Sequence, residues 1–213
     1  MSPTIAIPLG SRLLNQCRKP SGLLGRLVLW RMNRWHSKLT DWGLGHVAIR
    51  SDDNILDVGC GGGRTIAKLA SLAVAGKVYG VDLSEESVAV SRRTTRELIR
   101  ADRVEIRHAS VSELPFANDA FDLVTAVETH YYWPDLNADV REILRVLKPG
   151  GTILMIAESY RGGKHDRLLR HLVRYAHLTV NEHRHLLANA GFSDVAVFED
   201  YEKGWICAVG RKP

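Results

Sequence analysis

The stretch "ILDVGCGGGRT", residues 55–65, is an apolar run that ends at Asp57 and continues into glycine at four of the five positions from 59 to 63. A short apolar run followed by glycines is typical of a buried strand that ends in a tight turn. Glycine in such numbers is entropically costly, and it indicates a close approach of another group to the backbone. We therefore predict a strand that turns into a helix beginning near Gly62, with a ligand at the carboxyl end of the strand.

Outward from this stretch, residues 51–213 alternate between β-branched apolar runs and segments with apolar residues at three- and four-residue spacing. This alternation predicts a parallel sheet flanked by helices. The predicted strands are residues 54–58, 77–81, 104–108, 121–127 and 151–157, and the predicted helices are 62–72, 84–99 and 135–147. Two last runs, 194–198 and 205–209, predict a terminal hairpin at one edge of the sheet, with the last strand antiparallel.

The size and composition of the chain predict one domain. Its 213 residues are 45% hydrophobic, which is enough for one core, and no linker divides them. Cys17, Cys60 and Cys207 are too far apart to indicate a disulfide framework or a thiolate zinc site, so a cytoplasmic location fits best. The apolar residues near 23–30 are interrupted by Arg26 and are too few to span a bilayer.

Positive charge is concentrated at the start of the chain. Residues 1–50 hold eight Lys and Arg against one acid, or +7, whereas residues 51–213 hold 21 basic and 23 acidic residues, or −2. We interpret residues 1–50 as an N-terminal helical lid or cap over a domain of residues 51–213. Its basic face is either simply solvated or a contact with an anionic membrane surface or nucleic acid.

The spacing of the glycines restricts the ligand. A dinucleotide fingerprint needs a third glycine where this chain has Arg64, and the pattern is instead DxGxGxG from Asp57. A carboxylate at Asp57 would repel a pyrophosphate and attract a cationic group. Asp82 ends the second strand in "VYGVDLS", where its carboxylate can accept hydrogen bonds from both ribose hydroxyls. A nucleoside with a cationic amino-acid tail describes S-adenosylmethionine.

Four motifs, "ILDVGCGGG", "VYGVDLSEESV", "ELPFANDAFDLV" and "REILRVLKPGGTIL", occur in the order and spacing of one family. Residues 51–213 resemble a class I S-adenosylmethionine-dependent methyltransferase of the small-molecule type. The resemblance implies an α/β fold, a Rossmann-like doubly wound seven-stranded sheet of order 3-2-1-4-5-7-6, with strand 7 antiparallel and helices on both faces.

The resemblance also implies cofactor-binding roles for nine residues, which are Asp57, Gly59, Cys60, Gly61, Gly63, Asp82, Leu83, Ser110 and Val111. Asp57 and the glycines would surround the methionine portion, with Cys60 as a backbone contact. Asp82 would take the ribose, and Leu83 would pack on the adenine. Ser110 stands where many relatives have an aspartate for the adenine amino group, and a hydroxyl accepts that hydrogen bond more weakly.

Two residues are candidates for catalysis. Methyl transfer is an in-line displacement that depends mainly on alignment and exclusion of water, but a hydroxyl or protonated amine acceptor also needs a base. His130 in "VETHYYWPD" follows the fourth predicted strand and is the candidate base, unless it is a structural histidine. Glu128 stands where the family lines the space near the methyl group, or else its carboxylate is satisfied by backbone N–H groups.

Aromatic residues suggest where an acceptor binds. Tyr131 and Tyr132 crowd the loop after the fourth strand, Trp35 and His36 belong to the N-terminal segment, and Tyr160 opens an insertion over residues 158–183. In this family such insertions usually shape the acceptor pocket. We therefore predict a small-molecule acceptor with an O, N or S nucleophile.

Other classes of function are less well supported. There is no NPPY-like tetrad after the fourth strand and no separate RNA-binding domain, so nucleic acid is disfavoured as an acceptor. The histidines at 177, 183 and 185 lack an accompanying acid cluster, which predicts metal-independent transfer. RNA or protein methylation, and binding of S-adenosylmethionine without catalysis, stay open as alternatives.

Overall fold

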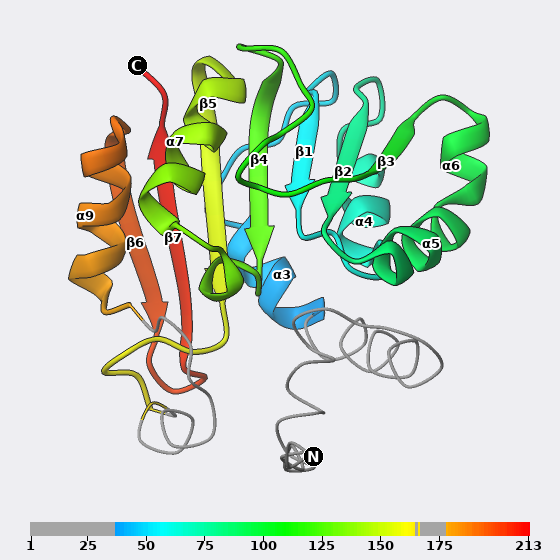
Figure 1. Ribbon diagram of the computed structural model, residues 1–213. Coiled ribbons are helices and arrows are strands. Elements are labelled where there is room, and N and C mark those ends of the chain that lie inside the picture. Colours follow the sequence, from blue (N-terminus) through cyan, green and yellow to red (C-terminus); the bar gives the residue numbers. More distant parts are fainter. Residues whose placement is uncertain (1–36, 165, 167–177) are drawn as a thin grey trace, which may run out of the picture.

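The structure is a computed structural model that describes residues 37–164, 166 and 178–213. Most of the N-terminal segment, including Trp35 and His36, lies outside the described residues, as does part of the insertion over residues 158–183. In chain order the elements are α3 Ser37–Leu44, β1 Ile55–Val58, α4 Arg64–Leu72, β2 Val78–Asp82, α5 Glu85–Thr94, α6 Arg96–Arg100, β3 Val104–His108, β4 Phe121–Val127, the short 3₁₀-helix η1 His130–Tyr132, α7 Leu136–Val146, β5 Leu147–Ala157, α9 Val180–Ala190, β6 Ser193–Asp200 and β7 Trp205–Arg211 (Figure 1).

The seven strands form one sheet of order β3-β2-β1-β4-β5-β7-β6. The neighbours from β3 to β5 pair in parallel, and β7 runs antiparallel to both β5 and β6. The predicted α/β fold, the strand order and the terminal hairpin are therefore confirmed.

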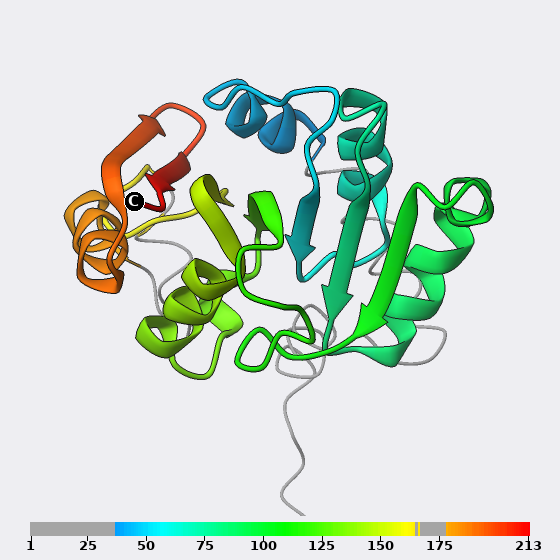
Figure 2. The same ribbon diagram turned by 90° about the horizontal axis from the view of Figure 1, so that it is seen from above.

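Helices cover both faces of the sheet (Figure 2). Successive side chains of a strand point to opposite faces, and in β1 the buried Ile55 packs with α3, α4 and α5, while the buried Leu56 packs with α7 and α9. The strands carry near-continuous apolar runs because both of their faces are buried.

The largest differences from the predicted boundaries occur at two elements. The single helix expected over residues 84–99 is divided into α5 and α6 at Thr95, whose backbone leaves the helical region with φ −105° and ψ 18° and whose hydroxyl donates to the Ser91 carbonyl oxygen at 2.9 Å. The fifth strand begins at Leu147 rather than at residue 151, since Leu147 already pairs with Phe121 of β4 before a register shift.

The described part of the N-terminal segment belongs to the core. Helix α3 packs against β5 and β7, with Leu39 and Leu44 buried. It lies below the carboxyl ends of β1 and β4, at the lower edge of the sheet in Figure 1. Among the described residues, no helix has the length and apolar character needed to cross a membrane.

Candidate functional site

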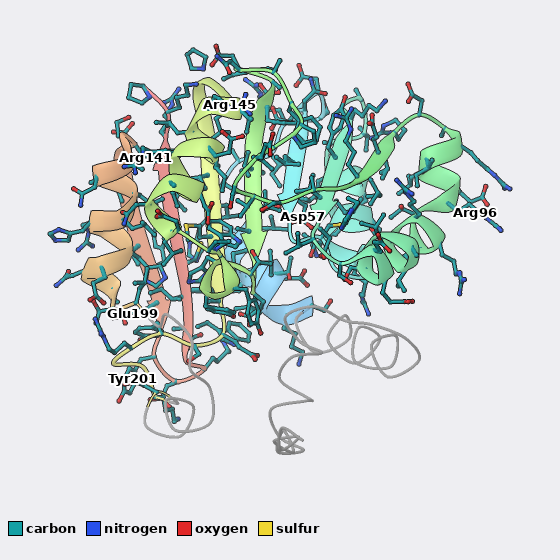
Figure 3. All side chains as sticks on the ribbon, in the orientation of Figure 1. Asp57, Arg96, Arg141, Arg145, Glu199 and Tyr201 are labelled. Carbon is teal, nitrogen blue, oxygen red and sulfur yellow. The ribbon has the colours of Figure 1, made fainter. Side chains whose placement is uncertain are left out.

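A cavity of about 570 Å³ opens at the carboxyl ends of β1, β2 and β4. This volume is within the range of small-molecule sites. The glycine turn, residues 109–111, residues 127–129 and 132–134, and one side each of α3 and α4 line it. Figure 3 shows Asp57 at this edge of the sheet, at the end of β1.

Asp57 is a buried carboxylate on the cavity wall, with 2% exposure. The Thr125 hydroxyl from the neighbouring strand β4 donates to Asp57 Oδ1 at 2.7 Å. Burial raises the pKa of Asp57 to about 7, which the Thr125 hydrogen bond opposes and the nearby Asp82 carboxylate reinforces. A cationic ligand group in the cavity would stabilise the charged form of this side chain.

Asp82 ends β2 and is fixed by the backbone around it. Its two carboxylate oxygens accept from the N–H of Gly61 at 2.9 Å and the N–H of Ser84 at 2.8 Å. Burial raises the pKa of Asp82 despite these hydrogen bonds. Each oxygen can accept further hydrogen bonds, so the carboxylate is oriented toward the cavity with acceptor capacity left over.

The glycine turn is held together largely by the protein's own contacts. A Cβ at Gly59 would lie 2.3 Å from Thr129 Cγ2, and a Cβ at Gly63 would lie 2.6 Å from Ser91 Oγ. Gly63 is absent from the cavity wall, and its role is to let α4 pack closely on α5. The N–H groups of Gly59 and Cys60 both donate to the Val81 carbonyl oxygen. The backbone donor of Cys60 therefore already has an acceptor within the protein.

The residues expected around the adenine lie together on the wall. Leu83 is 51% exposed at the rim, Val111 is buried, and Ser110 lines the cavity beside them. The Ser110 hydroxyl accepts from the Ser112 N–H at 3.2 Å, which leaves a second lone pair on its oxygen.

Glu128 lines the cavity directly after β4, and its backbone has a φ of 60°. Its carboxylate accepts hydrogen bonds from the Tyr131 hydroxyl and from the Glu158 N–H, after β5. A residue with a Cβ in this left-handed conformation is strained, and such strain is concentrated at functional sites. Burial and the Glu128 charge raise the pKa of Tyr131 well above its usual value, so the phenol stays a donor.

His130 is 1% exposed and does not belong to the cavity wall. Its Nε2 atom lies 3.3 Å from Nε2 of His183 on α9. The residue that the sequence indicated as a base is therefore brought next to another histidine rather than to the space between Asp57 and Glu128.

The aromatic residues divide between the wall and the interior. Tyr132 and Trp133 line the cavity, whereas Tyr131 lies behind Glu128. Tyr160 is 2% exposed, and its hydroxyl donates to Glu199 of β6 at 2.6 Å, so it connects the segment after β5 to the terminal hairpin. Tyr160 is not on the cavity wall.

Sequence reasoning missed a polar side of the cavity formed by α3 and α4, with Ser37, Thr40, Arg64, Lys68 and Ser71. The signal was the spacing of Arg64, Lys68 and Ser71, which places them on one helical face opposite the buried Ile66, Leu69 and Ala70. Within residues 37–164, 166 and 178–213, no group of three or more His, Cys, Asp or Glu side chains is arranged to hold a metal ion.

Comparisons with known proteins identify this region independently. The model of a family described as "Methyltransferase domain" matches residues 56–155. This match runs from β1 through most of β5 and includes Asp57, Asp82 and Glu128.

Two curated relatives are similar over somewhat more than half of this chain. The chain is 34% identical to 27-O-demethylrifamycin SV methyltransferase of Amycolatopsis mediterranei over 119 residues, which is 56% of this chain and 43% of that protein. It is also 34% identical to demethylmenaquinone methyltransferase of Symbiobacterium thermophilum over 127 residues, 59% of this chain and 49% of the relative. The chain thus spans about half the length of the curated relatives it matches.

A solved structure extends the similarity of fold. A chain in a solved complex between the Haloferax volcanii Trm112 methyltransferase activator and a protein described as a methyltransferase has a TM-score of 0.77 and 24% sequence identity. The superposition covers 87% of this chain and 92% of that chain. At this level of identity the likeness concerns the fold alone.

Proposed function

We propose that this chain is a class I S-adenosylmethionine-dependent methyltransferase that transfers a methyl group from S-adenosylmethionine to a small-molecule acceptor, because a methyltransferase family model matches residues 56–155 and the curated relatives are named as methyltransferases. The observation that carries the proposal is that three carboxylates, Asp57, Asp82 and Glu128, end three adjacent strands and line one cavity. The printed names of the two curated relatives, which refer to a rifamycin and a menaquinone precursor, support an acceptor of small-molecule size.

The residues of the cavity fit this cofactor. The buried Asp57, whose pKa is raised to about 7, suits the ammonium group of the methionine portion, since a cation would compensate the burial of its charge. Asp82 suits the ribose hydroxyls, because the backbone already holds its oxygens in place. The adenine would lie among Leu83, Ser110 and Val111. When bound, the cofactor supplies an electrophilic methyl group on a sulfonium.

The chain's own contribution is to align the acceptor and exclude water. Glu128 is the carboxylate that reaches the cavity from β4, and Tyr131 and the Glu158 N–H fix its direction. With a hydroxyl or protonated amine as acceptor, we assign to Glu128 the role of holding the acceptor proton or receiving it. His130 is a less favourable candidate, since it lies off the cavity wall.

Product formation tests the proposal. The purified chain is incubated with S-adenosylmethionine and a panel of phenols, amines, thiols and carboxylic acids, and S-adenosylhomocysteine and methylated product are quantified together. We expect S-adenosylhomocysteine and methylated product to form in equal amounts with at least one acceptor. This product formation should be lost in the Asp82→Ala variant. Cofactor binding without product across this panel, and with RNA and protein substrates, would support a non-catalytic binding protein instead.

A further inference from the structure

The cavity extends well past the glycine turn, along α4. The wall residues of this helix share one face, since they form two pairs at four-residue spacing, Arg64 with Lys68 and Ala67 with Ser71. Seven residues of helix measure about 10 Å along the axis, at 1.5 Å per residue. Ser37 and Thr40 of α3 form the opposite side. We call this part of the cavity the α3–α4 groove, defined by these six residues.

The charges of the cavity are separated. Its three carboxylates, Asp57, Asp82 and Glu128, lie at the strand ends, whereas the α3–α4 groove contains the cations Arg64 and Lys68. A positively charged cofactor group is favoured at the first location. An anionic group is favoured at the second, because charges of one sign on a cavity wall attract the opposite sign.

Arg64 has its guanidinium available for a ligand. The residue is exposed, and no hydrogen bond or ion pair connects its side chain to another residue in the described part of the chain. Its five N–H donors suit the paired oxygens of a carboxylate or a phosphate.

Lys68 already has a partner, but a weak one. Its Nζ pairs with Asp41 of α3, where the side chains are 39% and 51% exposed. Exposed ion pairs of this kind contribute little to stability. Lys68 can therefore exchange Asp41 for a ligand anion at small cost.

The N-terminal residues are poorly suited to fill the groove by charge. Residues 1–36 contain six Lys and Arg and no Asp or Glu. Basic residues would be repelled by Arg64 and Lys68, so the charge of the groove favours an anionic occupant.

We propose that the α3–α4 groove binds a carboxylate or phosphate group of the methyl acceptor, with Arg64 and Lys68 as its ligands. This inference rests on the proposed methyl transfer for the identity of the occupant, and it makes anionic small molecules the acceptor class. The carboxylate of the cofactor itself is the other source of the same chemistry, and the experiment separates the two.

The test titrates inorganic pyrophosphate into the full chain saturated with S-adenosylhomocysteine and measures heat. We expect binding in the wild type and a loss of about tenfold in affinity in Arg64→Gln and in Lys68→Gln, as for a charge-assisted hydrogen bond. Asp41→Asn should strengthen binding, because it releases Lys68. Arg96→Gln is the matched control, since Arg96 lies on α6 away from the cavity (Figure 3) and pairs only with Glu97 among the described residues.

The outcomes are distinct. No pyrophosphate binding in the wild type, or equal binding in the Arg64→Gln/Lys68→Gln double variant, overturns the proposal. Competition between pyrophosphate and S-adenosylhomocysteine, with weaker S-adenosylhomocysteine binding in Arg64→Gln, assigns the cations to the cofactor and also overturns it. Pyrophosphate binding in the groove without methyl transfer to any acceptor would instead contradict the proposed function. Among active acceptors, 4-hydroxybenzoate should have a lower KM than its methyl ester, and Lys68→Gln should remove the difference.

Discussion

His130 and His183 meet through their Nε2 atoms at 3.3 Å, and each is 1% exposed. The Thr179 carbonyl oxygen, 2.9 Å from His183 Nδ1, can only accept, so Nδ1 carries a proton. A neutral His183 then presents the lone pair of Nε2, and His130 Nε2 is the donor. The pair joins η1, beside the cavity, to the first turns of α9.

This pair predicts a loss of stability in acid. Burial lowers the pKa of His183, so the unfolded chain takes up a proton near pH 6.5 while the folded chain resists it. The contribution of neutral His183 to the free energy of unfolding is present above about pH 6.5 and is lost as the pH falls below that value. Urea unfolding between pH 7.5 and 5.5 should show a smaller loss in His183→Gln than in the wild type. The exposed His185→Gln is the control, and identical pH dependence in all three proteins would contradict the prediction.

The raised pKa of Asp57 predicts a dependence of stability on pH that is opposite to that of His183. It also predicts that cofactor binding is coupled to the release of a proton. The folded pKa of about 7 exceeds the unfolded value of this carboxyl group, so its contribution to stability is full below about pH 4 and is lost as the pH rises through about 7. A bound cation favours the carboxylate and should release a proton near pH 6. Calorimetry of S-adenosylhomocysteine binding in two buffers of different ionisation enthalpy measures that proton. The Asp57→Asn variant should bind S-adenosylhomocysteine more weakly and should release no proton from this site. If the number of released protons is unchanged in this variant, the proton comes from another group.

Asp82→Ala should weaken the binding of S-adenosylmethionine by about 1.5–3 kcal/mol, the range for hydrogen bonds to a charged group. The measurement is a calorimetric titration. Asp122→Ala removes a carboxylate that pairs with Lys148 outside the cavity and serves as the matched control. Equal dissociation constants for the two variants would remove Asp82 from the ribose site.

Gly59 should be sensitive to a single methyl group. The Cβ of Gly59→Ala would lie 2.3 Å from Thr129 Cγ2, and the φ of 75° adds strain of about 1 kcal/mol. We expect reduced thermal stability and a displaced Glu128, seen as reduced turnover. Thr129→Ala removes the nearest atom, so the double variant should recover part of the stability. If the stability changes of Gly59→Ala and Thr129→Ala simply add in the double variant, the contact between these residues is not the cause of the stability loss in Gly59→Ala.

Glu128 and His130 can be separated by kinetics. With a hydroxyl acceptor, Glu128→Gln should lower turnover by about 10²-fold, as for loss of a general base, while cofactor affinity is preserved. His130→Gln should lower stability and change turnover much less, because its ring is packed against His183. A pH–rate limb that disappears in His130→Gln but persists in Glu128→Gln would restore the histidine as the base.

The regular part of the fold was predictable because its cause is local. Alternation of apolar runs with helical spacing is enough to locate the strands, and the glycine turn that follows Asp57 is enough to predict a ligand there. The order of the strands came from a family resemblance, since periodicity carries no information on which strands are neighbours.

The details of the site depended on contacts between distant segments. The contact of Gly59 with Thr129 and the pairing of His130 with His183 join residues 70 and 53 positions apart. Likewise, the face of α4 that reaches the cavity is set by how α3 and α4 pack. None of these contacts has a signal within a short window of sequence.

The left-handed backbone at Glu128 has a consequence for protein engineering. Glycine adopts a φ of 60° without the penalty of about 1 kcal/mol that a Cβ incurs, so Glu128→Gly relieves strain even as it deletes the carboxylate. That relief is opposed by the loss of the hydrogen bonds that the carboxylate accepts from the Tyr131 hydroxyl and the Glu158 N–H, each of which contributes about 1.5–3 kcal/mol when the acceptor is charged. At position 128 the strain of the backbone and the hydrogen bonds of the carboxylate therefore act in opposite directions, so Glu128→Gly is expected to lower the free energy of unfolding although it relaxes the backbone.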